Sequence, residues 1–296
     1  MFVPAYNRHY IDHALTTRAD ALILDVEDSV PDANKQQARE ILADYFSRGV
    51  FHGRVVFIRI NAVGTPHFDR DMDQLVFDDL CGYMPAKIRS ADEIVLIDRR
   101  LSLQEQKQGL APGKFALMPL IENAAAVTGI REIASASRRL IALCFGAEDY
   151  LDSMHGVYSR SAEGLAYPRS VIAAAARAEG LLPIDTPYLE IRDTDGFLQT
   201  EREMYRLGFA GCLLLTPKQI EPAHAVFSPS EEEIRHAENV IAAVEETMTR
   251  GTGIAVLDGL VVGPPLRKLA AKVLALRDRI QRVEAEKRPF PAEQGE

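Results

Sequence analysis

Cysteine is scarce in this sequence of 296 residues, and its scarcity argues against a disulfide framework. The three cysteines, Cys81, Cys144 and Cys212, are an odd number, and each lies in an apolar run. Buried free thiols of this kind are typical of proteins in a reducing compartment. We therefore expect a cytoplasmic protein.

Long hydrophobic runs are missing as well. No apolar stretch reaches the roughly twenty residues that are needed to span a bilayer. The N-terminal segment also lacks the charged region followed by an apolar region that marks a signal peptide. We therefore expect no membrane partner and no export from the cell.

Positive charge is in deficit, since 43 Asp and Glu residues stand against 34 Lys and Arg residues and give a formal net charge of -9. Binding to a phosphate backbone needs a clustered positive surface, so we expect no nucleic-acid partner. A small anionic substrate is compatible with this charge, because a few arginines can reverse the field within a pocket. The seven histidines follow no metal-ligand spacing, and none is assigned to a metal or to catalysis.

The chain does contain a regular alternation of apolar runs and longer segments with helical spacing, which is typical of a parallel sheet crossed by helices. Eight runs are predicted as strands, at residues 1–3, 21–28, 55–61, 81–87, 115–122, 140–149, 182–188 and 211–217. A doubly wound open sheet would alternate in the same way. Eight strands and this chain length favour an α/β protein of the (β/α)8 TIM-barrel class.

The pattern changes after residue 217. Residues 228–233 read as a helix start, with a serine at the cap and three glutamates in the first turn. A helix to about Arg250, a break rich in glycine and proline at residues 251–265, and a final helix at residues 266–284 are expected. We predict a catalytic barrel at residues 1–227 and a C-terminal helical extension, acting as a lid, at residues 228–296.

Two acidic residues close neighbouring predicted strands. Glu122 ends the fifth strand and Asp149 ends the sixth, at the face of a barrel where catalytic residues collect. Two carboxylates that leave room for water and substrate oxygens are the usual way in which Mg²⁺ is held. A helix cap or a surface acid is the alternative for either residue alone, and their pairing favours the metal.

Arg59 lies inside a strongly apolar run, where an unpaired cation would be costly to bury. It therefore needs an anionic partner. Asp25 or Glu27 could supply an internal ion pair, and a substrate could supply the partner instead. The two interpretations are compatible within one site.

The order and spacing of several motifs are specific when they are taken together: residues 2–4, 25–30, 59–65, 121–122, 145–149 and 258–259. On these motifs the chain resembles the citrate lyase beta subunit-like family, within the malyl-CoA lyase and HpcH/HpaI aldolase group. The resemblance implies a barrel with a helical extension, assembled as a homotrimer or hexamer. It also implies that the substrates are CoA thioesters of hydroxy acids.

The resemblance further implies roles for individual residues. Glu122 and Asp149 would bind Mg²⁺, with Mn²⁺ as the alternative metal, and Arg59 would contact the substrate. Asp258 would be brought over the active site of a neighbouring subunit, where it could act as a base. Without the resemblance, Asp258 reads as a turn residue, because Asp-Gly is a common turn pair.

The remaining residues of the expected site belong to substrate and CoA binding. By the same resemblance, Arg8 and Lys35 lie where basic residues approach the CoA phosphates. Further members of this binding set are Asp25, Glu27, Gly64 and Thr65.

The implied reaction is the Mg²⁺-dependent cleavage of a 3-hydroxyacyl-CoA, of the citramalyl-CoA, malyl-CoA or citryl-CoA type, to a short acyl-CoA and a 2-oxo acid. Such a retro-Claisen step needs a base for the hydroxyl proton, polarisation of the emerging keto acid and stabilisation of the thioester enolate. A metal-dependent class II pyruvate aldolase that acts without CoA is one alternative. A catalytically silent scaffold or effector-binding subunit is another.

Overall fold

The computed structural model describes residues 1–159, 163–249 and 254–286. The chain divides into two compact units, Met1–Ala223 and His224–Glu296. Within the described ranges, no helix is both long enough and apolar enough to cross a bilayer.

The first unit is built on parallel strands in two sheets that are each continuous in sequence, β1 to β5 and β6 to β9. The strands are β1 (Phe2–Pro4), β2 (Leu22–Asp25), β3 (Val56–Ile60), β4 (Gly82–Pro85), β5 (Ala116–Leu117), β6 (Leu120–Ile121), β7 (Ala142–Phe145), β8 (Leu182–Asp185) and β9 (Gly211–Cys212). Every strand pair in these two sheets is parallel.

Backbone hydrogen bonds join the two sheets at both of their borders. The predicted fifth strand is divided at Met118 and Pro119 into β5 and β6, and proline has no N–H to donate to a ladder. Across this border the Ile141 N–H donates to the Leu117 carbonyl at 3.0 Å. At the other border the Phe2 N–H donates to the Leu214 carbonyl at 2.9 Å. The prediction of a (β/α)8 barrel is confirmed, with β5 and β6 counted as one strand.

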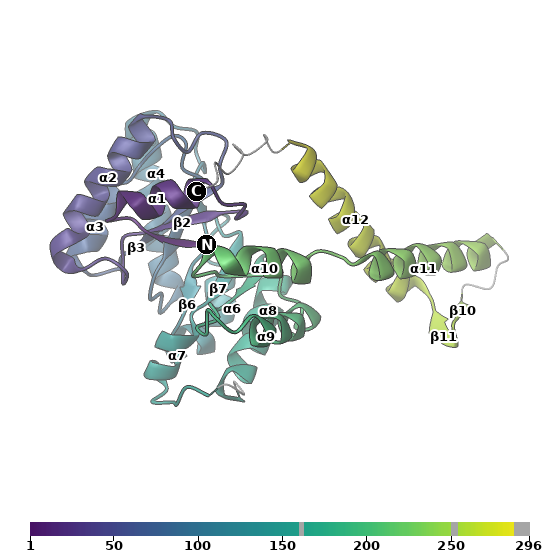
Figure 1. Cartoon of the computed structure of the whole chain (residues 1–296). Helices are drawn as coiled ribbons and strands as arrows, with labels where there is room; N and C mark the ends of the chain where they lie inside the picture. Colours follow the sequence, from purple (N-terminus) through teal and green to yellow (C-terminus); the bar gives the residue numbers. More distant parts are fainter. Residues whose placement is uncertain (160–162, 250–253, 287–296) are drawn as a thin grey trace. The chain divides into compact units, whose positions relative to one another are not determined.

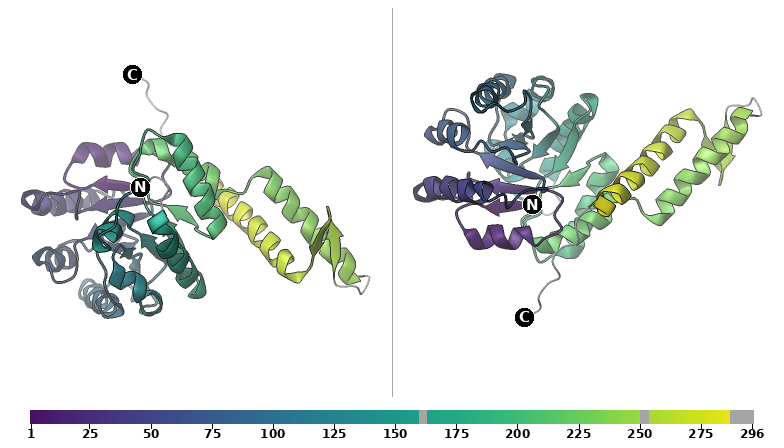
Figure 2. Two further views of the ribbon diagram at one scale, coloured as in Figure 1. Left: turned by 90° about the horizontal axis from the view of Figure 1, so that it is seen from below. Right: turned by 90° about the horizontal axis from the view of Figure 1, so that it is seen from above.

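The helices of the first unit lie outside the strands, as Figures 1 and 2 show. They are α1 (Arg8–Leu15), α2 (Lys35–Ser47), α3 (Pro66–Gln74), α4 (Ala91–Gln108), α5 (Ala124–Thr128), α6 (Ile130–Ala134), α7 (Ala147–Ser153), α8 (Ala166–Ala178), α9 (Thr194–Leu207) and α10 (Ile220–Phe227), the last crossing the boundary between the units. Three short 3₁₀ turns, Asp32–Asn34, Glu163–Leu165 and Pro217–Gln219, connect them to the strands.

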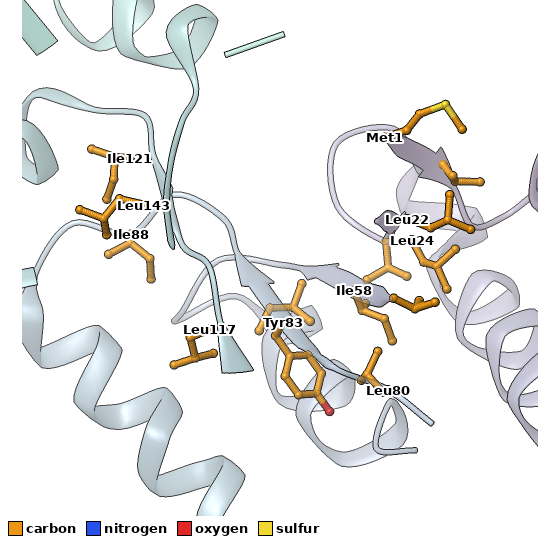
Figure 3. Close-up of a cluster of buried hydrophobic side chains, with 14 of the residues drawn as sticks. Met1, Leu22, Leu24, Ile58, Leu80, Tyr83, Ile88, Leu117, Ile121 and Leu143 are labelled. Carbon is orange, nitrogen blue, oxygen red and sulfur yellow. The ribbon is translucent and has the colours of Figure 1, made fainter. Parts of the chain in front are cut away.

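Alternate residues of each strand enter two different cores, because side chains along a strand point to opposite faces. Leu22, Leu24 and Ile58 belong to the large core that also contains helix residues (Figure 3). Ile23 and Phe57 belong to a second cluster drawn from the strands and their flanks without any helix residue, which places it inside the barrel. The barrel interior is filled by the side chains of Ile23, Phe57, Met84, Met118, Leu120, Ala142, Cys144 and Leu213.

The second unit is a helical pair joined by a hairpin. Its elements are α11 (Glu231–Thr249), the antiparallel strands β10 (Ala255–Leu257) and β11 (Leu260–Val262), and α12 (Pro264–Glu286). The two helices pack against each other, as Figure 2 shows, around a small core that includes Val240, Val244 and Val262. The two helices expected in this region are present, although Arg250 lies outside the described residues.

Seven of the eight predicted strands end earlier than expected, and the first strand is the exception. The prediction that Asp149 closes a strand is wrong, since β7 ends at Phe145 and Asp149 lies in the first turn of α7. Acidic residues are favoured there by the partial positive charge of a helix N-terminus. The second strand likewise ends at Asp25, and the residues that follow it form a loop.

Candidate active site

A buried ion pair lies at the carboxyl ends of β2 and β3. Asp25 and Arg59 occupy paired positions on these strands, and both follow interior-facing residues by two places. The Arg59 Nε donates to Asp25 Oδ1 at 2.7 Å, and Nη2 donates to Oδ2 at 2.6 Å. Burial opposes ionisation of Asp25, but the two bonds from Arg59 outweigh it and hold the pKa of this carboxyl below its usual range.

Arg59 is held on two further sides. Its Nη1 lies 3.4 Å from Glu27 Oε2, and its guanidinium carbon lies 4.8 Å from the centre of the Phe2 ring. Its side chain is 13% exposed, so part of a fixed planar cation remains accessible. Burial would lower the pKa of Arg59, but the hydrogen bonds to Asp25 raise it further, so the charge is permanent.

Residues 26–30, called here the acidic loop, carry an unbroken series of bonded amides. The N–H groups of Glu27 and Ser29 donate to the two carboxylate oxygens of Asp25. The Asp28 N–H donates to Glu27 Oε2, and the Val30 N–H donates to the Glu27 carbonyl. The Val26 N–H donates to the Arg59 carbonyl. The donor–acceptor distances run from 2.8 Å to 3.2 Å. Asp25 therefore shapes this loop as well as pairing with Arg59.

Lys87 connects the acidic loop to Glu122. Its Nζ donates to Glu27 Oε1 at 2.8 Å and to both Asp28 carboxylate oxygens at 2.8 and 3.0 Å. Its backbone has a left-handed φ of 54°, which is uncommon for a residue with a side chain, and its main-chain N–H donates to the Glu122 carboxylate. Burial would lower the pKa of Lys87, but hydrogen bonds to Asp28 and Glu27 raise it above its usual value.

Glu122 follows β6 and is 3% exposed. A Cβ on Gly146 would lie 2.7 Å from Glu122 Cβ and 2.8 Å from its Oε2, so only glycine fits beside this carboxylate. Burial raises the pKa of Glu122 to about 8, and the charge of Asp149 raises it too, against the opposing effects of Lys87 and Arg59. The positive charge near Glu122 is thus too small to offset the effect of burial on its pKa.

Two further acids lie in the first turn of α7. Asp149 is half-buried, and burial together with the charge of Asp149 raises the pKa of Glu148. Among the described residues, no group of three or more His, Cys, Asp and Glu side chains is placed to hold a metal ion. Glu122 and Asp149 could still hold a hard cation that keeps several water ligands, because Mg²⁺ is commonly bound through one or two carboxylates.

Lys35 lies apart from the exposed part of the site. It is 6% exposed, and its Nζ donates to Val26 O at 3.1 Å, Glu27 O at 3.0 Å and Asn61 Oδ1 at 2.8 Å. An ammonium group has three protons, so these acceptors use all of them. Contact between Lys35 and a CoA phosphate stays a prediction, and this geometry does not favour it.

The other predicted binding residues lie on separate loops. Arg8 is exposed at the start of α1, pairs with Asp44 at 2.5 Å, and helps to line a surface pocket of about 490 Å³. Gly64 has a φ of 84° in the loop after β3, and Thr65 caps α3 by accepting the Phe68 N–H at 3.3 Å. Their contacts with substrate stay predictions.

Asp258 belongs to the second unit, at the exposed turn between β10 and β11. Asp258 and Gly259 both have positive φ, 51° and 80°, as a two-residue hairpin turn of type I′ requires. The turn geometry expected of an Asp-Gly pair is therefore present. A catalytic role for Asp258 stays a prediction.

Sequence reasoning missed Lys87. A lysine that follows an apolar run is the same signal that identified Glu122, but the run at residues 81–87 was used only as a strand. The bonds that make Lys87 part of the site come from two other strand ends and from a left-handed backbone, and neither is visible in the local sequence.

The comparison with known proteins gives a consistent assignment. The family model described as HpcH/HpaI aldolase/citrate lyase matches residues 1–217. The citrate lyase subunit beta of Leuconostoc mesenteroides subsp. cremoris is 32% identical over 286 residues, which cover 97% of this chain and 95% of that protein. The L-malyl-CoA/beta-methylmalyl-CoA lyase of Cereibacter sphaeroides is 30% identical over 283 residues, covering 88% of each.

The solved structures agree with the relatives. CitE from Mycobacterium tuberculosis, in complex with magnesium, acetoacetate and coenzyme A, superimposes with a TM-score of 0.76 at 28% identity, covering 94% of this chain and 96% of that chain. A citrate lyase from Burkholderia xenovorans, at 20% identity and a TM-score of 0.80, shares the fold. The resemblance seen in the motifs is confirmed: this chain belongs to the HpcH/HpaI aldolase/citrate lyase family.

Proposed function

We propose that this chain is a Mg²⁺-dependent carbon–carbon lyase that cleaves a 3-hydroxyacyl-CoA of the citramalyl-CoA, malyl-CoA or citryl-CoA type. The products are a short acyl-CoA and a 2-oxo acid. The observation that carries the proposal is the Glu122 carboxylate, which is buried beside Gly146 and whose pKa is raised by burial and by the negative charge of Asp149. A divalent cation would supply compensating positive charge.

The relatives support the same chemistry. Their names are those of lyases that act on citrate or on malyl-CoA, and one solved neighbour holds magnesium, acetoacetate and coenzyme A together. These ligands belong to that protein, and we extend them to this chain as part of the proposal. Mn²⁺ is the alternative metal.

Glu122 and Asp149 would hold the metal, and the space that Gly146 leaves beside Glu122 supports this fit. When bound, Mg²⁺ would supply electrophilic polarisation of the substrate's hydroxyl and carboxylate oxygens. The main-chain N–H of Lys87 fixes one oxygen of Glu122, so that the direction of the carboxylate is set before substrate arrives.

Arg59 would stabilise the negative charge that develops on the thioester oxygen. Its guanidinium is aimed by Asp25 and cannot lose its proton, so it acts as a preorganised donor. Asp258 would remove the hydroxyl proton from a substrate bound to a neighbouring subunit of a trimer or hexamer. Arg8 would face the CoA phosphates in the surface pocket that it helps to line.

The experiment is a screen of the purified chain with Mg²⁺ against citramalyl-CoA, malyl-CoA and citryl-CoA, in which the released 2-oxo acid is measured. We expect cleavage of at least one ester, and its loss in Glu122→Gln and Asp149→Asn. Glu105→Gln is the matched control, because Glu105 is a buried acid paired with Arg139 at the amino ends of the strands. Absence of cleavage, or wild-type Mg²⁺ affinity in Glu122→Gln by titration calorimetry, would overturn the proposal.

A further inference from the structure

Four polar side chains beneath the acidic loop are almost completely buried. Lys35 and Asn61 are 6% exposed, Arg39 is 1% exposed and Asp71 is 0% exposed. They come from α2, from the end of β3 and from α3. Buried polar groups are costly unless each one finds a partner, so their contacts reveal what they hold in place.

The first of these contacts reach the acidic loop from below. Lys35 Nζ donates to the carbonyls of Val26 and Glu27, and Asn61 Nδ2 donates to Val26 O at 3.0 Å. Lys35 and Asn61 are also bonded to each other at 2.8 Å. The carbonyl groups at the start of the acidic loop are therefore fixed, just as its amides are fixed from the other side by Asp25 and Arg59.

The remaining contacts fix Asn61 itself. Asp71 Oδ2 accepts the Asn61 N–H at 2.9 Å and Nδ2 at 2.7 Å, and Asp71 Oδ1 accepts Arg39 Nε at 2.7 Å. Arg39 Nη2 in turn donates to the His67 carbonyl in α3 at 3.3 Å. The four side chains Lys35, Asn61, Asp71 and Arg39 thus form one connected series, called here the buried polar chain.

The acidic loop and its supports are balanced in charge. Four acids, Asp25, Glu27, Asp28 and Asp71, are matched by four cations, Lys35, Arg39, Arg59 and Lys87. This balance distinguishes the loop from Glu122 and Asp149, where negative charge is in excess. The loop therefore needs no ligand to hold its shape.

We propose that the buried polar chain is a positioning device for the reaction. It fixes the acidic loop, and the fixed loop keeps Glu27 in place to hold Arg59 together with Asp25. Glu27 and Asp28 of the same loop hold Lys87. The main-chain N–H of Lys87 in turn orients Glu122. The members of the buried polar chain are positioning residues, since none of them faces the accessible part of the site. The catalytic consequence rests on the proposed function, but the structural consequence does not.

The structural test is amide hydrogen exchange in Lys35→Met, which removes the charge and the donors but keeps the length of the side chain. Loss of the two carbonyl contacts should speed exchange of the amides at residues 26–30 by at least ~10-fold, as local opening becomes easier. Glu105→Gln, which disturbs a buried Arg–Glu pair at the opposite end of the barrel, should leave these amides unchanged. Unchanged exchange in Lys35→Met would overturn the proposal.

The kinetic test separates positioning from contact with CoA. In Lys35→Met we expect kcat to fall at least ~10-fold while KM for the CoA ester changes little, because small displacements of a catalytic group are costly. A raised KM with unchanged kcat would overturn the proposal and assign Lys35 to the CoA phosphates. Asp71→Asn is the second variant should Lys35→Met not fold, with the same expectations. If the wild type cleaves no ester, the proposed function fails while the exchange experiment still decides this inference.

Discussion

At the scale of single residues, the planar geometry of the Arg59 guanidinium matters more than its positive charge alone. The guanidinium binds Asp25 through two parallel hydrogen bonds, its Nη1 lies near Glu27, and a small part of the side chain stays exposed. We predict that Arg59→Lys lowers kcat/KM by at least ~10²-fold, because a point charge cannot make both bonds and still reach a substrate. Steady-state kinetics on the cleaved ester measures this. Near-normal activity in the lysine variant would reduce Arg59 to an internal partner of Asp25.

A second buried acid, Glu201 on α9, leads to a prediction about stability. Glu201 is 1% exposed, and burial, aided by the charge of Asp185, raises its pKa to about 9 from its ordinary value of 4.5. The folded state therefore binds a proton that the unfolded chain releases between these two pH values. Stability contributed by the protonated carboxyl is present below the lower value and is lost as the pH rises toward the higher one.

We therefore predict that Glu201→Gln, which cannot ionise, becomes more stabilising as the pH rises. Its melting temperature should differ little from that of the wild type near pH 5 and exceed it by about 2 °C or more near pH 8. Thermal unfolding across this range measures the difference. A difference that does not vary with pH would show that the native Glu201 carboxyl is already ionised.

At the scale of elements, the turn between β7 and α7 decides whether Glu122 has room. A Cβ on Gly146 would overlap the Glu122 side chain, whereas a Cβ on Gly211 in β9 would meet Ile184 Cδ1 at an ordinary 3.5 Å. We predict that Gly146→Ala weakens Mg²⁺ binding at least ~10-fold by displacing the carboxylate, a cost typical of disturbing a ligand's surroundings. Gly211→Ala is the matched control and should bind Mg²⁺ normally. Equal Mg²⁺ affinities in Gly146→Ala and Gly211→Ala would show that Gly146 does not contribute to metal binding.

Much of this element-scale arrangement could be predicted from the sequence. The apolar runs located all the barrel strands, and the charges that interrupt or end them drew attention to Glu122 and Arg59, since a buried charge must be matched. Asp149 was identified but placed on a strand, because the apolar run that forms β7 continues through Gly146 to Ala147, the first residue of α7. Periodicity over so few residues cannot distinguish a strand from the start of a helix.

The contacts between elements could not be predicted in this way. The left-handed backbone of Lys87 and its bonds to Glu27 and Glu122 join three strand ends that are distant in sequence. The burial of Lys35 was equally hidden, since its three acceptors come from the loop after β2 and from Asn61, which directly follows β3. A lysine near the start of a helix reads as a solvent-exposed residue until its tertiary partners are known.

At the scale of the whole molecule, the second unit presents an unusual surface. Val256, Leu260 and Val261, which flank the Asp258 turn, are 71%, 51% and 63% exposed. We propose that this hairpin covers the active site of a neighbouring subunit. We predict that Asp258→Asn lowers kcat at least ~10²-fold while CoA-ester binding is nearly unchanged, the scale expected for loss of a positioned base. Burst kinetics and ligand titration measure the two effects separately.

A shared site makes a further prediction about mixtures. Asp258→Asn and Glu122→Gln proteins, combined under conditions that exchange subunits, should regain part of the activity, because some interfaces would join an intact base to an intact metal site. Mixing each variant with itself is the control. Exchange without recovery would mean that Asp258 acts within its own chain or serves only as a turn residue.

The hydrogen bond from Phe2 to Leu214 has a consequence for folding during synthesis on the ribosome. It joins the first strand of the barrel to the segment after the last, so the ring cannot close until Leu214 has emerged. Until then the finished strands β1 to β5 form a sheet with unpaired edges, and such edges attract other chains. Translation that stalls after the fifth strand should therefore leave a nascent chain that depends on chaperones. Once Leu214 has emerged, closure of the barrel pairs the edge strands with each other.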